Sequence, residues 1–184
     1  MRLFTGLALP AETEKQIADL LETLRPTAPL AWTRVGNLHV TTRFIGEWPE
    51  EQLEELKERL TTLQERSPLS ISISGIGWFP NPHSPRVLFA GVRASEDLQR
   101  LVSDTNAVLQ TLGLAPEEKA FRPHLTLARI NKSSVSLAAL RQSIASRDSP
   151  DFGDFLVSGF SLFQSKPGPG GSIYTRLADF RFLQ

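Results

Sequence analysis

The sequence predicts an α+β fold in which two pseudo-symmetric lobes, each an antiparallel sheet with helices on its outer face, enclose a cleft. Three observations support this prediction. Short strand patterns alternate with helical patterns along the whole chain. The order of these elements repeats once, and equivalent residues are separated by about 84 to 85 positions. Serine alternates with apolar residues over 69–76, which is typical of an antiparallel sheet with one solvated face.

The first copy of the repeat, about 1–80, contains three strand patterns and two helical patterns in alternation. Ile17, Leu20 and Leu24 recur at helical spacing and predict the first helix. Pro49 suits the first turn of the second helix, where no amide hydrogen is needed. The predicted elements are a strand at 3–9, a helix at 12–24, a strand at 38–45, a helix at 49–63 and a strand at 69–76.

The second copy, about 85–165, repeats the same order of elements. The proline-rich segment 80–85 is expected to connect the copies, and the glycine-rich segment 167–171 is expected to form a hairpin loop. The predicted elements are strands at 86–92, 124–130 and 155–163, helices at 98–112 and 137–144, and a last strand at 172–182. The matched residues are Arg2 and Arg86, His39 and His124, Ser74-Gly75 and Ser158-Gly159, and Phe79 and Phe163. We therefore expect one bilobal domain over 1–184.

The composition narrows the possible functions. The 184 residues are 40% hydrophobic and 22% charged, which is ordinary for a globular protein. No apolar run approaches the roughly 20 residues that span a bilayer, and residues 1–6 lack a secretory pattern, so we expect a cytoplasmic protein. The absence of cysteine excludes disulfides, zinc–thiolate sites and cysteine nucleophiles. A formal net charge of zero argues against a non-specific duplex binder and favours a short nucleic-acid end as partner.

The pattern His-x-Thr occurs on the two matched strands at 38–45 and 124–130. Because residues i and i+2 of a strand share a face, each strand presents an imidazole, a hydroxyl and a guanidinium together. The same alternation places Phe44 on the opposite, core face and turns Arg129 away from the histidine face, unless a β-bulge brings Arg129 back. The residues that share the proposed functional faces are His39, Thr41 and Arg43 on the first strand, and Arg122, His124 and Thr126 on the second.

These two faces suit a phosphodiester if the lobes place them across one cleft. Threonine hydroxyls can donate to non-bridging oxygens, and arginine can neutralise the phosphate charge. One imidazole can remove a proton from water while the other protonates the departing oxygen, since the ordinary histidine pKa of roughly 6.5 allows both states near neutral pH. A duplicated structural histidine is the alternative interpretation. With few carboxylates nearby and no cysteine, we expect no metal and no cofactor.

The motifs also resemble those of a known family. The residues that carry the likeness are Leu38-His39-Val40-Thr41 and Arg122-Pro123-His124-Leu125-Thr126-Leu127-Ala128-Arg129, with Phe4-Thr5-Gly6-Leu7, Trp32-Thr33-Arg34, Arg86-Val87-Leu88-Phe89-Ala90-Gly91-Val92 and Tyr174 around them. Paired motifs with these flanks resemble the 2H phosphoesterase superfamily, and within it the RNA 2′,3′-cyclic phosphodiesterases, also called 2′-5′ RNA ligases. The likeness covers nearly the whole chain.

The resemblance implies a bilobal fold whose active site lies between the lobes. It implies hydrolysis of RNA 2′,3′-cyclic phosphate ends to 2′-phosphates, with reversible 2′-5′ ligation as a further activity. In the family, the first histidine, here His39, is the proton donor and the second, His124, is the proton acceptor. The hydroxyls of Thr41 and Thr126 are implied to bind phosphate oxygens.

The sequence also suggests residues that contact the substrate and the kind of partner that the protein binds. Trp32 and Tyr174 are candidates for contact with the substrate, and the protein is expected to be a monomer that binds RNA ends or small cyclic-phosphate nucleotides, without a membrane. Two other functions remain open. One is a phosphodiesterase for another small cyclic or 2′-5′-linked nucleotide, and the other is a non-catalytic module that binds RNA ends.

Overall fold

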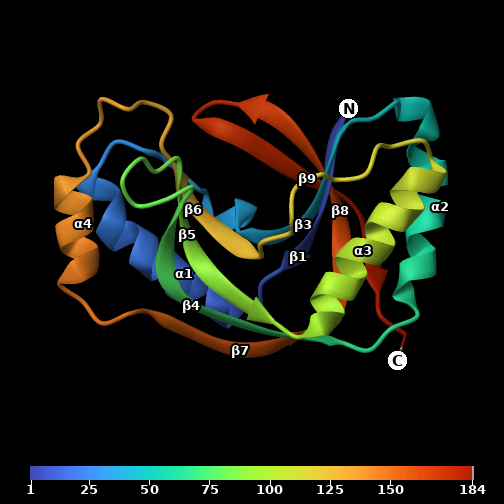
Figure 1. Ribbon diagram of the computed structural model, residues 1–184, viewed down its shortest axis with the longest axis horizontal. Helices are drawn as coiled ribbons and strands as arrows, with labels where there is room; N and C mark the ends of the chain where they lie inside the picture. The colour runs from blue at the N-terminus through green and yellow to red at the C-terminus, as the bar shows by residue number, and fades with distance from the viewer. Residues whose placement is uncertain (184) are drawn as a thin grey trace.

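A computed structural model describes residues 1–183, which form one continuous antiparallel sheet with helices on its outer face (Figure 1). The strand order is β7-β4-β5-β6-β3-β1-β8-β9, and the short β2 pairs with β6. The strands are β1 (Arg2–Ala8), β2 (Ala31–Trp32), β3 (His39–Glu47), β4 (Leu69–Phe79), β5 (Val87–Ala94), β6 (His124–Arg129), β7 (Asp151–Val157), β8 (Gly159–Gly168) and β9 (Gly171–Arg181).

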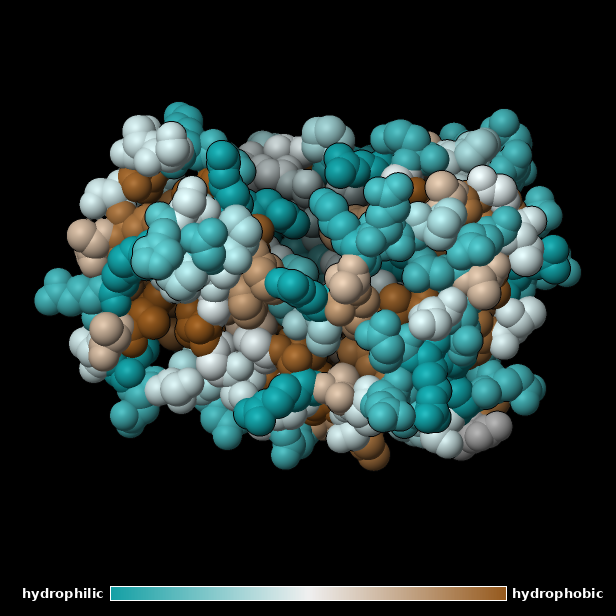
Figure 2. Space-filling model, in the orientation of Figure 1, coloured by the Kyte–Doolittle hydropathy of each residue, from teal (hydrophilic) through white to brown (hydrophobic). Residues whose placement is uncertain are grey.

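The helices divide into two pairs, one at the left and one at the right of the sheet in Figure 1. Helix α1 (Ala11–Leu24) contacts α4 (Ala138–Ala145) and β7, whereas α2 (Leu53–Thr61) contacts α3 (Glu96–Thr111) and β9. The apolar faces that predicted these helices are buried: Ile17, Leu21 and Leu24 in α1 are fully covered. In the space-filling view, hydrophilic side chains predominate on the face that Figure 1 presents, and this face is hollowed near its centre (Figure 2).

The α+β class with antiparallel strands is confirmed, with some corrected boundaries. The expected strand at 155–163 is two strands, β7 and β8, separated at Ser158. One strand must end there and another begin, because β7 pairs with β4 and β8 pairs with β1, in opposite halves of the sheet. The expected helix at 49–63 is α2 flanked by two 3-10 turns, Glu50–Gln52 and Thr62–Gln64.

The two copies of the repeat do not build separate halves of the sheet. Strand β4, from the first copy, pairs with β5 from the second, and β8, from the second copy, pairs with β1 from the first. The copies therefore exchange their last strands. The expected two sheets are one sheet, which continues through the pairing of β3 with β6 at Val40 and Leu125. Within residues 1–183, no helix is both long and apolar enough to span a membrane.

Candidate active site

The two His-x-Thr strands lie side by side at the centre of the sheet. Strands β3 and β6 are antiparallel neighbours, and both begin with their histidine. His39, Thr41, His124 and Thr126 line one pocket at this junction. The expectation that two imidazoles and two hydroxyls converge is therefore met by the geometry. The other residues that line this pocket are Thr33, Asn37, Phe44, Arg129 and Tyr174.

Each imidazole is oriented by a backbone carbonyl two residues before it. The Nδ1 atom of His39 lies 2.6 Å from the carbonyl oxygen of Asn37, and Nδ1 of His124 lies 2.7 Å from that of Arg122. Since a carbonyl only accepts, each Nδ1–H donates and Nε2 is the nitrogen left for proton exchange. The Nε2 atom of His39 already has a hydroxyl partner, Oγ1 of Thr41, at 2.7 Å.

A stacked pair of phenylalanines lies against each imidazole. Phe4 and Phe163 stack with ring centroids 5.1 Å apart, and their centroids lie 4.8 and 5.8 Å from that of His39. Phe79 and Phe89 stack at 4.1 Å, and their centroids lie 5.0 and 5.8 Å from the His124 ring. These contacts cover part of each imidazole ring and leave both histidines partly buried.

The environment lowers the pKa of both histidines below the usual value. Burial is the main cause of the lowered His39 pKa, and the charges of Arg129 and His124 lower it further; the hydrogen bond to Asn37 acts in the opposite direction. Burial and Arg129 likewise lower the pKa of His124, against the hydrogen bond to the Arg122 carbonyl. Both imidazoles therefore favour the neutral form near neutral pH, and Arg129 is a charge that acts on both.

A β-bulge brings Arg129 into the pocket. Leu88 pairs with Ala128 while Phe89 pairs with Thr126, so Leu127 is an additional residue in β6. The extra residue reverses the alternation after Thr126, and Arg129 returns to the histidine side, where it lines the pocket. Strand alternation alone assigns Arg129 to the face opposite to His124. The β-bulge that was named as the exception to this prediction is present in the structure.

A matching bulge turns Arg43 away from the pocket. Thr5 pairs with Arg43 and Gly6 with Thr41, so Thr42 is additional in β3. The prediction that Arg43 shares the face of the first histidine is therefore wrong. Its guanidinium is buried and lies 2.6 Å from a carboxylate oxygen of Glu117.

Phe44 occupies the place that was expected for the arginine. Its side chain is 52% exposed and lines the pocket, so its expected place in the core is also wrong. The bulge at Thr42 is the reason, because it moves Arg43 and Phe44 to the faces opposite to those of a regular strand, before a second register shift at Ile45.

The remaining candidates divide between pocket and periphery. Tyr174 lines the pocket, edge-on to His39 at 5.2 Å between ring centroids. The Arg122 side chain is exposed and does not line the pocket, although its carbonyl orients His124. Trp32 also lies outside the pocket, since its indole donates to the Ala28 carbonyl and packs against the core.

Asn37 and Thr33 are pocket residues that the sequence reasoning missed. Asn37 precedes His39 by two residues, as Arg122 precedes His124, so the two are equivalent in the repeat, about 85 positions apart. This equivalence is the sequence signal that could have identified Asn37 as a neighbour of the site. Thr33 has no such signal: it reaches the pocket because its hydroxyl donates to the Thr126 carbonyl, at 2.9 Å across a short strand pairing. Over residues 1–183, no three His, Asp or Glu side chains group as metal ligands would.

This fold and pocket place the chain in a class of phosphoesterases. The family model described as LigT like Phosphoesterase matches twice, over residues 7–89 and again over 92–174. The chain therefore belongs to the LigT-like phosphoesterase family.

Individual relatives agree with this assignment. The chain is 34% identical to the RNA 2′,3′-cyclic phosphodiesterase of Archaeoglobus fulgidus over 180 residues, which cover 98% of this chain and 99% of the relative. It is 35% identical to the Thermus thermophilus protein of the same name, over 98% of this chain and 89% of the relative. The crystal structure of TT0787 from Thermus thermophilus superimposes with a TM-score of 0.83 at 30% identity, over 99% and 98% of the two chains.

Proposed function

We propose that this protein hydrolyses 2′,3′-cyclic phosphates at RNA ends to 2′-phosphates, with His39 and His124 as acid and base. The convergence of two imidazoles from adjacent strands on one pocket carries the proposal, since each ring is held through Nδ1 by its own carbonyl and Nε2 is the nitrogen left for proton exchange. The names of the relatives that match nearly the whole chain support the same substrate.

The reaction needs one proton removed and one delivered. His124, neutral, accepts a proton from water as its oxygen forms a bond to phosphorus. The bond from phosphorus to the ribose O3′ breaks, and protonated His39 donates its Nε2 proton to that oxygen. The product keeps its phosphate on O2′, and solvent exchange restores both imidazoles. The assignment of donor and acceptor follows the family resemblance, because the two strands present their rings alike.

The neighbouring groups stabilise the charge on phosphorus. In this proposal the hydroxyls of Thr41 and Thr126, which line the pocket, donate to non-bridging oxygens, and Arg129 supplies the positive charge that Arg43 was expected to supply. Phe44 and Tyr174 offer aromatic surfaces at the same pocket on which a base can stack. If a ribose 5′-hydroxyl takes the place of water, the same step forms a 2′-5′ linkage.

Separate alanine substitutions of the two histidines test the proposal. We expect His39→Ala and His124→Ala each to lower kcat on a nucleoside 2′,3′-cyclic phosphate by about 10²- to 10⁴-fold, with wild-type activity preserved in EDTA. Chromatography of the product should find phosphate on the 2′ oxygen only.

The third histidine provides the matched control. His83 is exposed in the connector between β4 and β5, and its replacement by alanine should leave turnover unchanged. Full activity in either pocket variant would exclude the acid–base pair, and binding of cyclic phosphate without turnover by the wild type would favour a non-catalytic RNA-end module.

A further inference from the structure

The histidine pocket continues into a longer groove along one half of the sheet. A second pocket shares His39, Asn37 and Tyr174 with it. A third pocket shares Ala8, Leu9 and Arg176 with the second. We use "the β9 groove" for the second and third pockets together. It runs from His39 along β9 to Arg181, where the ends of the curled sheet approach each other.

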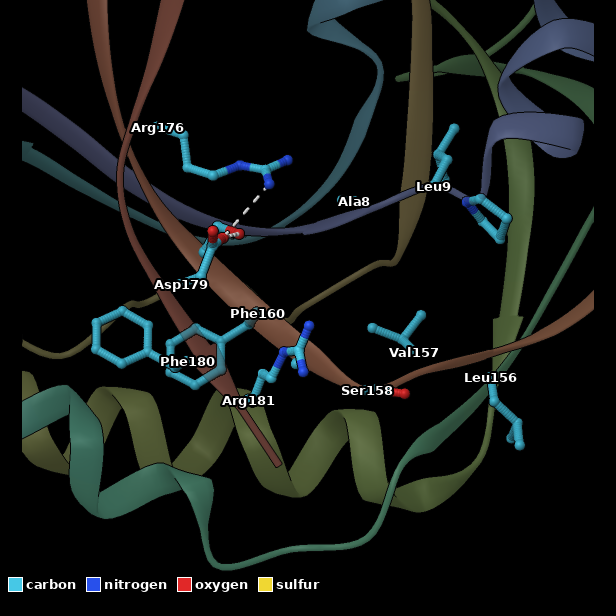
Figure 3. Close-up of a pocket in the computed structure, with 13 residues that line it drawn as sticks. Ala8, Leu9, Leu156, Val157, Ser158, Phe160, Arg176, Asp179, Phe180 and Arg181 are labelled. Carbon is cyan, nitrogen blue, oxygen red and sulfur yellow. Dashed lines mark hydrogen bonds and ion pairs between the residues drawn. The ribbon is translucent and has the colours of Figure 1, made fainter. Parts of the chain in front are cut away.

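Two guanidinium groups from β9 point into the far part of the β9 groove (Figure 3). Arg176 lies over the Phe163 ring at 5.7 Å from its centroid, and its Nη1 is 3.5 Å from a carboxylate oxygen of Asp179. That carboxylate also accepts from the buried Ser161 hydroxyl at 2.5 Å. Asp179 therefore holds the Arg176 side chain in place. Within residues 1–183, the guanidinium of Arg181 makes no ion pair.

We propose that the β9 groove binds the single-stranded RNA that precedes the cyclic end, with Arg176 and Arg181 on its backbone phosphates. This inference rests on the proposed function. A 2′,3′-cyclic phosphate closes the 3′ end of a strand, so every other phosphate of the substrate lies on the 5′ side and needs one path out of the pocket. The β9 groove shares its lining with the pocket on the His39 side, and its cations suit a phosphate track.

The charge balance suits a short track. The chain has as many acidic as basic residues, so attraction to RNA has to be local. Two acidic residues line the β9 groove: Glu14 in the second pocket, and Asp179 in the far pocket, where Arg176 already opposes its charge. Within residues 1–183, Arg181 has no ion-pair partner at the end of the groove, so its removal should weaken the binding of long substrates.

The test compares two substrates in one assay. A uridine 2′,3′-cyclic phosphate reaches only the histidine pocket, whereas a tetranucleotide with the same end also fills the β9 groove. In Arg181→Gln, we expect the ratio of kcat/KM for the tetranucleotide to that for the mononucleotide to fall about fivefold. The slope of log(kcat/KM) for the tetranucleotide against log salt should become shallower by about 0.7, the value for one lost contact to a single strand.

Arg93→Gln is the matched control. Arg93 is an exposed arginine on β5, in the half of the sheet opposite to the β9 groove, and it lines none of the three pockets. Its replacement removes the same charge and should leave the ratio unchanged. The proposal is overturned if the ratio of the two kcat/KM values is unchanged in Arg181→Gln, or if it falls equally in both variants. A fall of this ratio in Arg93→Gln alone also overturns it, because the RNA strand would then lie on the β5 half of the sheet.

The two proposals fail in distinguishable ways. Absence of turnover of the mononucleotide by the wild type contradicts the proposed function. In that case the proposal for the β9 groove is tested by measuring the binding of a labelled tetranucleotide that ends in a 3′-phosphate, by fluorescence anisotropy. Weaker binding by Arg181→Gln than by Arg93→Gln supports the groove, and equal binding overturns it.

Discussion

At the scale of single residues, Arg129 links the titration of the two imidazoles. Its positive charge disfavours the protonated form of both rings, so it lowers the pKa of His39 and of His124. The proposed mechanism needs one ring protonated and the other neutral at the same time. A cation that acts on both rings therefore favours the neutral base and disfavours the protonated acid, so it moves the pH range of activity towards lower pH.

Removing this cation should shift the pH dependence in a defined direction. In Arg129→Gln, the pKa of each imidazole should rise, because the imidazolium is no longer repelled. The base then needs a higher pH to become neutral, and the acid stays protonated to a higher pH. We expect both limbs of the kcat/KM profile for a cyclic mononucleotide to move to higher pH, along with a lower maximum.

The control for this profile is Arg122→Gln. That substitution also removes a nearby guanidinium, but it keeps the backbone carbonyl that orients His124. Its pH limbs should stay where the wild type has them. If the limbs of Arg129→Gln also stay in place, the charge of Arg129 does not control the two imidazoles.

At the scale of the elements, the two bulges decide which side chains reach the pocket. Alternation along a regular strand correctly predicts that His39 shares a face with Thr41, and His124 with Thr126. Beyond the threonines this alternation fails, because Thr42 and Leu127 are each additional residues. No local sequence signal, such as a glycine, marks either bulge, so the place of the following residues could be learned only from the pairing with β1 and β5.

The bulge in β3 gives Arg43 a structural role that can be measured. The exposed fraction of its side chain is 8%, whereas that of its partner Glu117 is 38%. Replacement by methionine removes the ion pair and the donor to the Ala115 carbonyl. Because the remaining carboxylate can be hydrated, we expect a loss of about 1–3 kcal/mol in the free energy of unfolding by urea.

Activity separates this role from phosphate binding. The kcat/KM of folded Arg43→Met should equal that of the wild type well below its unfolding temperature. Arg100→Met is the control for stability, since Arg100 is 68% exposed and its ion pairs within residues 1–183 are to its own helix, so its loss should change stability by no more than about 0.5 kcal/mol. A raised KM in Arg43→Met with unchanged stability would contradict the structural role and indicate that Arg43 binds phosphate.

At the scale of the whole molecule, the exchange of β4 and β8 interlocks the two copies of the repeat. The repeat in the sequence identifies which strands are equivalent, but it does not say which neighbour each strand pairs with. Strands that follow each other along the chain commonly pair as a hairpin, and β4 and β5 do so across the connector. That local pairing takes β4 out of its own copy, and β8 then fills the matching place beside β1.

The interlocked sheet should not fold from either copy alone. Fragments 1–82 and 83–184 each lack strands from both halves of the sheet. Each would therefore expose apolar residues that are buried in the whole protein, such as Leu7 of β1 and Leu88 of β5. We expect each fragment alone to show the circular dichroism of an unfolded chain. Mixing the two should restore the native spectrum and turnover of a cyclic mononucleotide. Cooperative unfolding of either isolated fragment would contradict this interdependence.

The matched bulges have one more consequence, because they place unlike side chains at a single equivalent position. One wall of the pocket receives the aromatic ring of Phe44 and the other receives the cation of Arg129. A cleft with two identical walls would accept a polymer in either polarity. Here the two directions of entry are chemically different, so an RNA strand bound as proposed would have one preferred polarity, with its 5′ end always on the same side of the pocket.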